Sequence, residues 1–461
     1  MSTLSRLRSL DRTSKAEVYY AGPSARDKLR YKKSKSLELV VLYSSISKVI
    51  RYLTSYNNST IKSIRRLKGA ILVRENGVEI LIRFPSIKRK KSKISNRISL
   101  LKLDSKRYYF TIDTIYVPIR SKNKSKIIDL HHGRRSIQNR KIETIENPKF
   151  IITKHPELII EALTLNATLN YSLSAELYHN IKINTKLIDS LDKKIIRDGL
   201  ISILLSKKPS RVFKLMFKLG VLQIILPELA ACRNLRQNSA YHKYDVFEHC
   251  LLACDAISAD LILRLAALFH DIGKAPTAKK TIVNGKTKIT FYNHEIVSAR
   301  LTFRILRRLK FPNALISKVA DIVRSHMYNY NPSAWKDAAV DRLIERLHIT
   351  EKDLADLNQH PVFQLRRADR IATGKGLHEV SGIQLNLERR IKDRFRKTLL
   401  MTRKDLEVDG HVLMKTFHLT EGPTIGHLLS YLFELVTKDP SLNTKEKLIE
   451  EASKYLSKAL K

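Results

Sequence analysis

The stretch that decides the fold is LILRLAALFHDIGKAP, residues 261–276. Its apolar, helix-like first half ends in the adjacent pair His270 and Asp271, and Gly273 and Lys274 follow. An imidazole and a carboxylate at the end of a buried helix can approach one cation together. Gly273 permits a turn that lets Lys274 reach back toward a phosphate. The stretch therefore predicts a cation and phosphate site at a helix end.

Four further candidate ligands lie in apolar helical segments on either side. They are His249 in YDVFEHCLLACDAI, His294 in YNHEIVSARL, His326 in VADIVRSHMY and Asp369 in FQLRRADRIA. A lone histidine on an apolar face is more often a core residue than a ligand. The order H…HD…H…H…D over successive helices predicts a shared site instead.

Six nitrogen and oxygen ligands suit one or two divalent ions of Mg, Mn, Fe, Ni or Zn, with open positions for water and phosphate. The first ion would be held by His249, His270, Asp271 and Asp369. We expect His294 and His326 to complete a second site or to contact substrate.

Together these segments resemble the HD phosphohydrolase superfamily. The resemblance implies a metal-dependent hydrolase in which His270, Asp271 and Lys274 are catalytic. The metal would lower the pKa of a bound water and neutralise charge on phosphoryl oxygens.

The N-terminal part of the chain has the patterns of a sheet. Leu37–Tyr43 is an apolar run typical of a buried strand, and Asn76-Gly77 within residues 70–84 predicts a hairpin with a tight I′ turn. Residues 108–119, YYFTIDTIYVPI, predict a third strand. From Glu146 onward the apolar period is 3.6, which predicts helices almost to the end of the chain.

The segments around the HD stretch resemble bacterial CCA-adding enzymes and poly(A) polymerases. The resemblance is carried by KKPSRVFKLMFKLGVLQIILPEL (207–229), the C-terminal segment 407–456 with its Gly-Pro-x-Ile-Gly element, and the order of AGPSARDKL, SLELVVL and GVEILIRF near the N-terminus. It implies an α+β fold with a small mixed-sheet, nucleotidyltransferase-like head and a long all-α remainder. The implied parts are a head at 1–122, a helical neck at 123–205, an HD body at 206–375 and a helical tail at 376–461.

The head departs from the pattern of that family. Nucleotidyl transfer needs closely spaced carboxylates that hold Mg²⁺ against the attacking hydroxyl and the nucleotide phosphates. The two positions of the family's Asp-x-Asp pair are Ser36 and Glu38 here, and Gly22-Pro23 replaces a pair of glycines. Arg26 and Asp27 of the same loop remain, and Glu79 matches the third acidic position. We therefore expect a degenerate head whose shape is kept and whose activity is lost.

The charge of the chain points to a polyanionic partner. Lys and Arg number 86 against 44 Asp and Glu, so the formal net charge is 86 − 44 = +42. Such a field attracts RNA, with tRNA as the candidate from the resemblance. The basic runs at 83–97 and 119–141 contain the candidate RNA contacts Arg89, Lys90, Lys91, Arg134 and Arg135. The alternative is that these runs are solvated loops.

The three cysteines lack the number and spacing of a disulfide framework or a CxxC metal site. No apolar run is long enough to cross a bilayer, and the N-terminus has no apolar signal core. We expect a cytoplasmic protein without a membrane partner.

Three functions follow as hypotheses. The first is a metal-dependent HD phosphohydrolase that acts on a phosphoester or cyclic phosphate of RNA ends or nucleotides, with an inactive head that helps to bind RNA. The second is an active enzyme that adds CCA or A to RNA 3′ ends through Glu38, Glu79 and a third carboxylate not identified in the sequence. The third is a non-enzymatic RNA-binding protein. The sequence favours the first.

Overall fold

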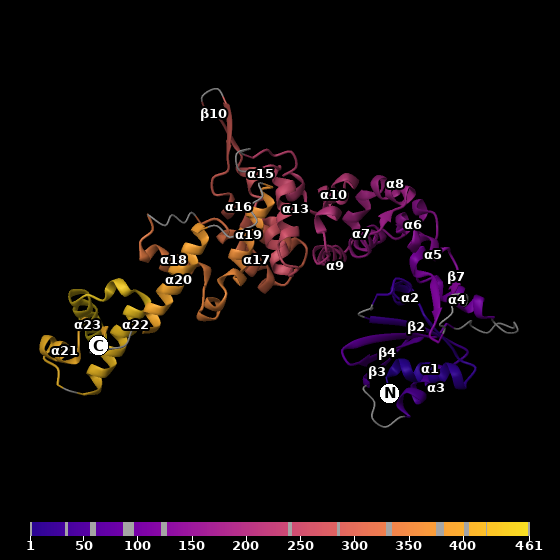
Figure 1. Ribbon diagram of the computed structural model, residues 1–461, viewed down its shortest axis with the longest axis horizontal. Helices are drawn as coiled ribbons and strands as arrows, with labels where there is room; N and C mark the ends of the chain where they lie inside the picture. The colour runs from indigo at the N-terminus through magenta and orange to yellow at the C-terminus, as the bar shows by residue number, and fades with distance from the viewer. Residues whose placement is uncertain are drawn as a thin grey trace. The chain divides into compact units, whose positions relative to one another are not determined.

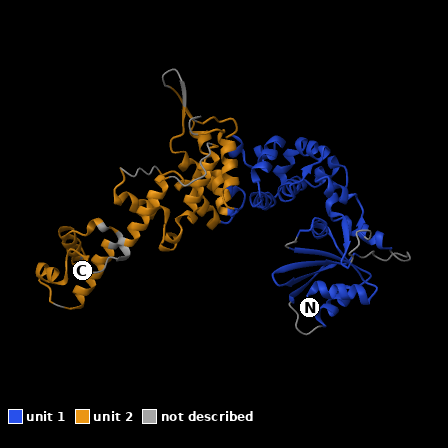
Figure 2. Cartoon of the chain, viewed as in Figure 1, with its two compact units in different colours: residues 1–231, 259–261, 305–312 blue, residues 232–258, 262–304, 313–461 orange. Residues whose placement is uncertain are grey.

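Figure 1 shows the computed structural model of the chain. The structure describes residues 2–32, 36–55, 61–85, 96–120, 127–237, 242–283, 286–328, 334–374, 382–400, 405–420 and 422–459. The chain forms two compact units (Figure 2): residues 1–231, 259–261 and 305–312 make the first, and residues 232–258, 262–304 and 313–461 make the second. The expected head and neck both fall in the first unit, and the finer division into four parts stays a prediction.

A seven-stranded sheet forms the head, with the order β3-β4-β5-β2-β1-β6-β7. Its strands are β1 (Glu17–Tyr20), β2 (Ser36–Leu42), β3 (Ile61–Leu67), β4 (Ala70–Glu75), β5 (Val78–Arg83), β6 (Ile115–Pro118) and β7 (Ile128–Asp129). The pairing of β2 with β5 is parallel and the other pairings are antiparallel. The expected mixed sheet is therefore confirmed.

The side chains of β2 alternate between the two faces of the sheet. One face packs against α1 (Thr3–Thr13) and α3 (Ile46–Thr54), and the other face, which carries Ser36 and Glu38, is called the site face. Successive side chains of a strand point to opposite faces. Leu39 and Val41 pack in the core that includes Leu7 of α1 and Val49 of α3. Val40 and Leu42 pack on the opposite face against α4 (Arg97–Ser105). Because the side-chain period is two, Ser36 and Glu38 share the face of Val40.

The predicted hairpin is present. Strands β4 and β5 are joined at Asn76 and Gly77, whose φ angles are +49° and +77°. Two successive residues with positive φ are what a type I′ turn requires.

The expected strand over 108–119 was wrong in its first half. Only Ile115–Pro118 forms a strand, β6, and it is preceded by a 3₁₀ turn at Thr111–Asp113. The amide of Thr111 donates to the Glu143 carbonyl, and the amide of Ile145 donates to the Tyr109 carbonyl. These partners from a distant segment take the backbone groups that a longer strand would need, which β-propensity cannot reveal.

Further helices of the first unit are α2 (Gly22–Leu29), which lies between β1 and β2, and a series that follows the sheet. The series is α5 (Gly133–Gln138), α6 (Pro148–Lys154), α7 (Leu158–Leu169), α8 (Ala175–Ile183), α9 (Lys193–Leu204), α10 (Pro209–Leu219), α11 (Val221–Ile225) and α12 (Pro227–Ala230). Helices α7 and α9 pack so closely that a Cβ on Gly199 would lie 2.2 Å from a methyl carbon of Ile160.

The second unit is helical. Its helices are α13 (Val246–Ala256), α14 (Leu261–Phe269), α15 (Lys274–Thr277), α16 (His294–Arg308), α17 (Asn313–Ser325), α18 (Asp337–Leu347), α19 (Pro361–Ala372), α20 (Gly382–Leu400), α21 (Gly410–Phe417), α22 (Pro423–Lys438) and α23 (Lys445–Ala459). The expectation of helices alone missed one hairpin, β10 (Lys279–Val283) with β11 (Lys286–Thr290). Its signal was Asn284-Gly285, the same dipeptide that predicts the hairpin in the head. Among the described residues, no helix is long and apolar enough to cross a membrane.

Candidate functional site

The six candidate ligands of the second unit come together from five helices. His249 lies in α13, His270 and Asp271 directly follow α14, and His294 begins α16. His326 directly follows α17, and Asp369 lies in the last turn of α19. All four imidazoles and Asp271 are buried, because the apolar faces of these helices pack together around them.

The ligand atoms form two triads, and Asp271, a member of the second triad, also lies near the histidines of the first. His249, His270 and Asp369 make one triad, and Asp271, His294 and His326 make the other; within each, the candidate ligand atoms lie within 4.8 Å of one another. Oδ2 of Asp271 is 3.3 Å from His270 Nε2 and 3.5 Å from His249 Nε2. Oδ1 of the same carboxylate is 3.2 Å from His294 Nε2 and 3.7 Å from His326 Nε2. The two carboxylate oxygens of Asp271 thus face different pairs of histidines.

Backbone carbonyls orient three of the imidazoles. Nδ1 of His270 lies 2.8 Å from the Ala267 carbonyl oxygen, and the same contact with the residue three positions earlier is 2.9 Å at His294 and 2.6 Å at His326. An Nδ1–H that donates to a carbonyl leaves Nε2 as the ligand atom, which is the usual arrangement around protein-bound metals.

The donor set fits divalent cations. The Nε2 atoms of His249 and His270 face each other at 3.2 Å, a contact that a shared proton or a cation must make favourable. Burial by itself would lower the pKa of His270, but Asp271 and Asp369 raise that pKa to about 10. Burial would raise the pKa of both carboxyls, yet the histidines around them, with Lys274 beside Asp271, hold both pKa values well below the usual range. Both acids are therefore ionised and available to cations.

Gln237 and His242 lie beside the triads and were not singled out in the sequence. The ammonium of Lys274 lies 2.6 Å from Oδ2 of Asp271 and also donates to Oε1 of Gln237 at 2.7 Å. The ring of His242 contacts that of His249 edge-on at 5.0 Å. The signal for His242 was its place seven residues before His249 in HKYDVFEH. Lys274 thus contacts a candidate ligand, and its expected role toward phosphate stays a prediction.

In the head, Glu38 is held by its neighbours on the site face of the sheet. Arg83 Nη1 donates to Oε2 of Glu38 at 2.6 Å, and the Tyr108 hydroxyl donates to the same oxygen at 3.1 Å. Arg83 also donates from Nε to Oδ1 of the buried Asp104 at 2.9 Å. Gly22 has a φ of +55° and packs against this group, where a Cβ would lie 2.8 Å from Oε2 of Glu38.

The other head residues lie as follows. Arg26 forms a buried ion pair of 2.6 Å with Asp113, and Asp27 lies 3.4 Å from Arg30. Ser36 is the register partner of Glu79 across β2 and β5, and Glu79 pairs with Arg74 at 2.8 Å on the surface. Among the described residues, the groups of three potential metal ligands are the two triads of the second unit, so Ser36, Glu38 and Glu79 do not form such a group.

A further carboxylate of the head, Asp113, was missed in the sequence. Its pKa is raised to about 6, mainly by desolvation on burial; Arg26 lowers this pKa, whereas Glu38 and Asp27 contribute to the rise. On α7, Glu161 has a pKa raised to about 7 by desolvation and then by Asp113 and Glu157. The head and the start of the neck thus hold a loose group of acids around Arg26.

The candidate RNA contacts are only partly covered by the structure. Arg134 and Arg135 are exposed on α5. Arg89, Lys90 and Lys91 lie outside the described residues.

Comparison with known proteins finds similarities in both units. The HD domain family matches residues 240–373, which include all six candidate ligands. The family described as a probable RNA and SrmB-binding site of polymerase A matches residues 170–233. The A-adding tRNA nucleotidyltransferase of Deinococcus radiodurans is 32% identical over 256 residues, which are 52% of this chain and 53% of that protein. The CC-adding tRNA nucleotidyltransferase of Thermus thermophilus is 29% identical over 256 residues, 54% of each chain.

The chain carries an HD domain and a segment that matches the RNA-binding family of poly(A) polymerases, and it is similar to tRNA nucleotidyltransferases. It spans about half the length of the curated relatives that it matches. Its fold resembles that of the Bacillus stearothermophilus CCA-adding enzyme solved in complex with CTP, with a TM-score of 0.56 and 16% identity over 99% of this chain and 98% of the other. A CCA-adding enzyme solved in an apo form gives a TM-score of 0.53 and 15% identity over 97% and 92%.

The expectation of an inactive head beside an HD hydrolase was wrong. The relatives are named for adding nucleotides to tRNA, and the family's fold extends through the head as well as the HD body. Asp113 is far from Asp27 and Glu38 in the sequence, but in the folded head both of these carboxylates raise its pKa.

Proposed function

We propose that this protein is a nucleotidyltransferase that adds nucleotides to the 3′ end of tRNA. The observation that carries the proposal is its relationship to enzymes named for adding A or CC to tRNA. The +42 charge supports a polyanionic substrate.

The head offers acids for this chemistry on its site face. Glu38 is the candidate to hold Mg²⁺, which would lower the charge on the nucleotide phosphates when bound. Arg83 occupies one oxygen of Glu38, so Glu38 must release it before it can hold a cation with that oxygen. Arg26 is a second basic group close to the same acids.

Incorporation of labelled ATP and CTP tests this proposal. The full chain is incubated with Mg²⁺ and tRNA transcripts that end before the CCA sequence, after the first C and after the second C. We expect extension of at least one transcript and a loss of about 100-fold or more in Glu38→Gln, because a metal ligand is removed. Glu146→Gln, an exposed acid of the same unit, is the matched control and should retain activity. Failure to extend any transcript with either nucleotide would overturn the proposal.

A second proposal concerns the HD site. We infer that its two triads bind two divalent cations with Asp271 as the bridge, and that they support hydrolysis of a phosphoester as an activity beside nucleotide addition. The support is the Asp271 carboxylate, whose two oxygens face different pairs of histidines, and the three Nε2 atoms aimed into the site by backbone contacts. The metal identity is left to measurement, since the same donors suit several ions.

Metal analysis tests this second site independently of the first. Protein loaded with Mn²⁺, Ni²⁺ or Zn²⁺ is desalted, its metal content is measured, and release of phosphate from a 2′,3′-cyclic nucleotide and a nitrophenyl phosphoester is followed. We expect His270→Ala to lose both metal and turnover while it still extends tRNA. Metal content equal to that of the wild type in His270→Ala would contradict the assignment.

A further inference from the structure

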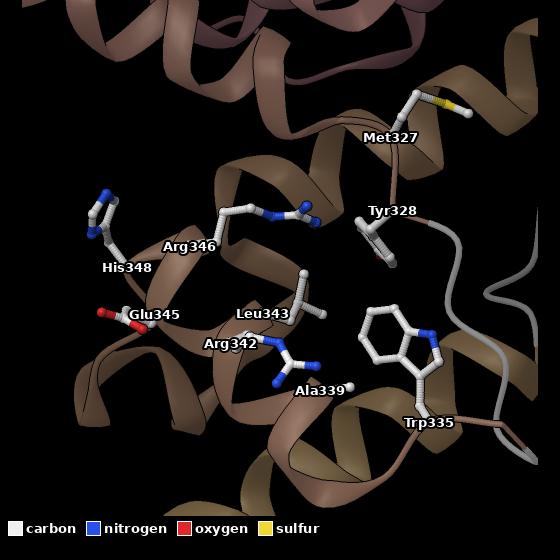
Figure 3. Close-up of a pocket in the computed structure, with 9 residues that line it drawn as sticks. All are labelled: Met327, Tyr328, Trp335, Ala339, Arg342, Leu343, Glu345, Arg346 and His348. Atoms are coloured by element: carbon white, nitrogen blue, oxygen red, sulfur yellow. The ribbon is translucent and has the colours of Figure 1, made fainter. Parts of the chain in front are cut away.

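A pocket of about 820 Å³ opens beside α18 in the second unit (Figure 3). This volume falls within the range of small-ligand sites, roughly 300–1,000 Å³. Tyr328 and Trp335 line it together with Arg342, Leu343 and Arg346. None of these five is a candidate metal ligand.

Helix α18 presents one face to the pocket. Ala339, Arg342, Leu343 and Arg346 follow the i, i+3, i+4, i+7 spacing of a single helical face, and all four line the pocket. Leu343 is buried and anchors this face, whereas the two arginine side chains are exposed. The pocket floor is therefore fixed, and its charged groups can reach a ligand.

The arginines of α20 form ion pairs with α18, whereas those on the pocket face of α18 do not do so within the described residues. Arg390 and Arg394 of α20 pair with Asp337 and Asp341 of α18 at 2.6 to 3.3 Å. Within the part of the chain that the structure describes, no ion pair or hydrogen bond is found for the guanidinium groups of Arg342 and Arg346. In Figure 3 both groups extend toward the side of the pocket that holds the two aromatic rings.

The two rings give the pocket a stacking surface. Arg366 Cζ lies 5.2 Å over the ring of Tyr328, and Phe363 meets that ring edge-on at 6.1 Å, so its position is fixed. Trp335, the only tryptophan of the chain, anchors its backbone carbonyl on Arg390 at 2.8 Å. Arg366 also lies 3.5 Å from Asp369, so contacts link this pocket to a triad of the HD site.

We propose that this pocket binds a nucleotide of single-stranded RNA, with a base on the Trp335 and Tyr328 side and phosphates at Arg342 and Arg346. Aromatic side chains stack bases of any identity, and arginine binds phosphate through paired N–H groups. The net charge of +42 favours this polyanion. A proline-rich peptide also docks on aromatic grooves, but it offers no anionic group to the guanidinium groups of Arg342 and Arg346. The inference rests on RNA as a partner, as in the proposed function, and adds a site for it.

The single tryptophan makes the test direct. The full chain is titrated with an oligouridylate of about ten nucleotides, which matches common single-strand site sizes, while Trp335 fluorescence is followed. We expect saturable quenching by the RNA and none by inorganic phosphate or a proline-rich peptide. In Arg342→Ala/Arg346→Ala the quenching affinity should fall about ten-fold or more, and the salt slope should fall by about 1.4 because two phosphate contacts are lost. Arg304→Ala, an exposed arginine of α16, should behave as the wild type.

A labelled oligouridylate checks the stacking part. Trp335→Ala should weaken its binding about ten-fold, and Trp335→Phe should restore most of it because a ring is kept. Absence of quenching by RNA, quenching by the peptide alone, or unchanged affinity in the double arginine variant would each overturn the proposal. Nucleotide addition to tRNA is measured on the same samples. Addition without quenching removes this inference and leaves the proposed function, whereas quenching without addition does the reverse.

Discussion

The carboxylates of the two candidate sites lie in opposite charge environments. In the HD site, histidines surround Asp271 and Asp369, and the pKa of each acid lies well below its usual range despite burial. At the head and neck, desolvation and other acids raise the pKa of Asp113 to about 6 and that of Glu161 to about 7. The two carboxylates of the HD site therefore stay ionised at neutral pH and can bind cations. The acidic group around Arg26 instead changes its charge near neutral pH.

Removal of the Asp271 carboxylate should give the largest effect. Asp271→Asn takes a ligand from the second triad and removes the negative charge next to His249 and His270 of the first. We therefore expect the affinity for Mn²⁺ to fall by more than about 100-fold, since even residues that only orient a ligand are worth about 10- to 100-fold. Calorimetric titration measures this. Asp321→Asn, on the exposed side of α17, is the control. Wild-type affinity in Asp271→Asn would mean that the six side chains form a buried ion-pair network and not a metal site.

Two arginines on adjacent strands test whether the head depends on its own buried charges. Arg83 reaches the buried Asp104, whose side chain is 1% exposed, whereas Arg74 and Glu79 form a surface pair with 60% and 50% exposure. Arg83→Met removes the nearest cation from the buried Asp104 carboxylate, which keeps the exposed Arg107 at 3.7 Å and the Tyr116 hydroxyl at 3.0 Å. The loss should destabilise the head by about 3 kcal/mol. Arg74→Met should cost about 1 kcal/mol or less. Hydrogen exchange of the β2 amides measures both, and equal losses would refute the distinction.

The contrast between the sites also explains what the sequence could predict. The HD ligands could be predicted because they lie at the ends or on the faces of regular helices, and because His270 and Asp271 are adjacent in the chain. The hairpin at Asn76-Gly77 could be predicted because its signal is also local, a dipeptide typical of a type I′ turn. The contacts of the head are not local: Arg83 meets Glu38 over 45 positions, and Arg26 meets Asp113 over 87. No pattern of period 2 or 3.6 shows such pairs.

The same limit explains the wrong functional choice. The sequence shows that Ser36 stands where a carboxylate is expected, but it does not show which acids the folded sheet brings beside Glu38. Asp113 comes from a 3₁₀ turn that was predicted as a strand. The pocket at Trp335 was missed because its aromatic residues lie outside regular helices, where spacing carries no information on facing.

The smallest expected effect is on the pH dependence of stability, and it tests whether the acids near Arg26 differ in charge from those of the HD site. The folded pKa of Glu161, about 7, lies above its ordinary value of 4.5. The folded state therefore binds more protons than the unfolded state between these values, and stability falls as pH rises through this window. Glu161→Gln should remove this loss of stability. The variant should therefore become more stable relative to the wild type as pH rises toward 8, whereas below pH 4.5 the difference in stability should not depend on pH. Glu176→Gln, an exposed acid of α8, is the control. Hydrogen exchange of α7 amides at several pH values measures the difference. An unchanged pH profile in Glu161→Gln would mean that Glu161 is ionised throughout, and the acids near Arg26 would then resemble those of the HD site in charge.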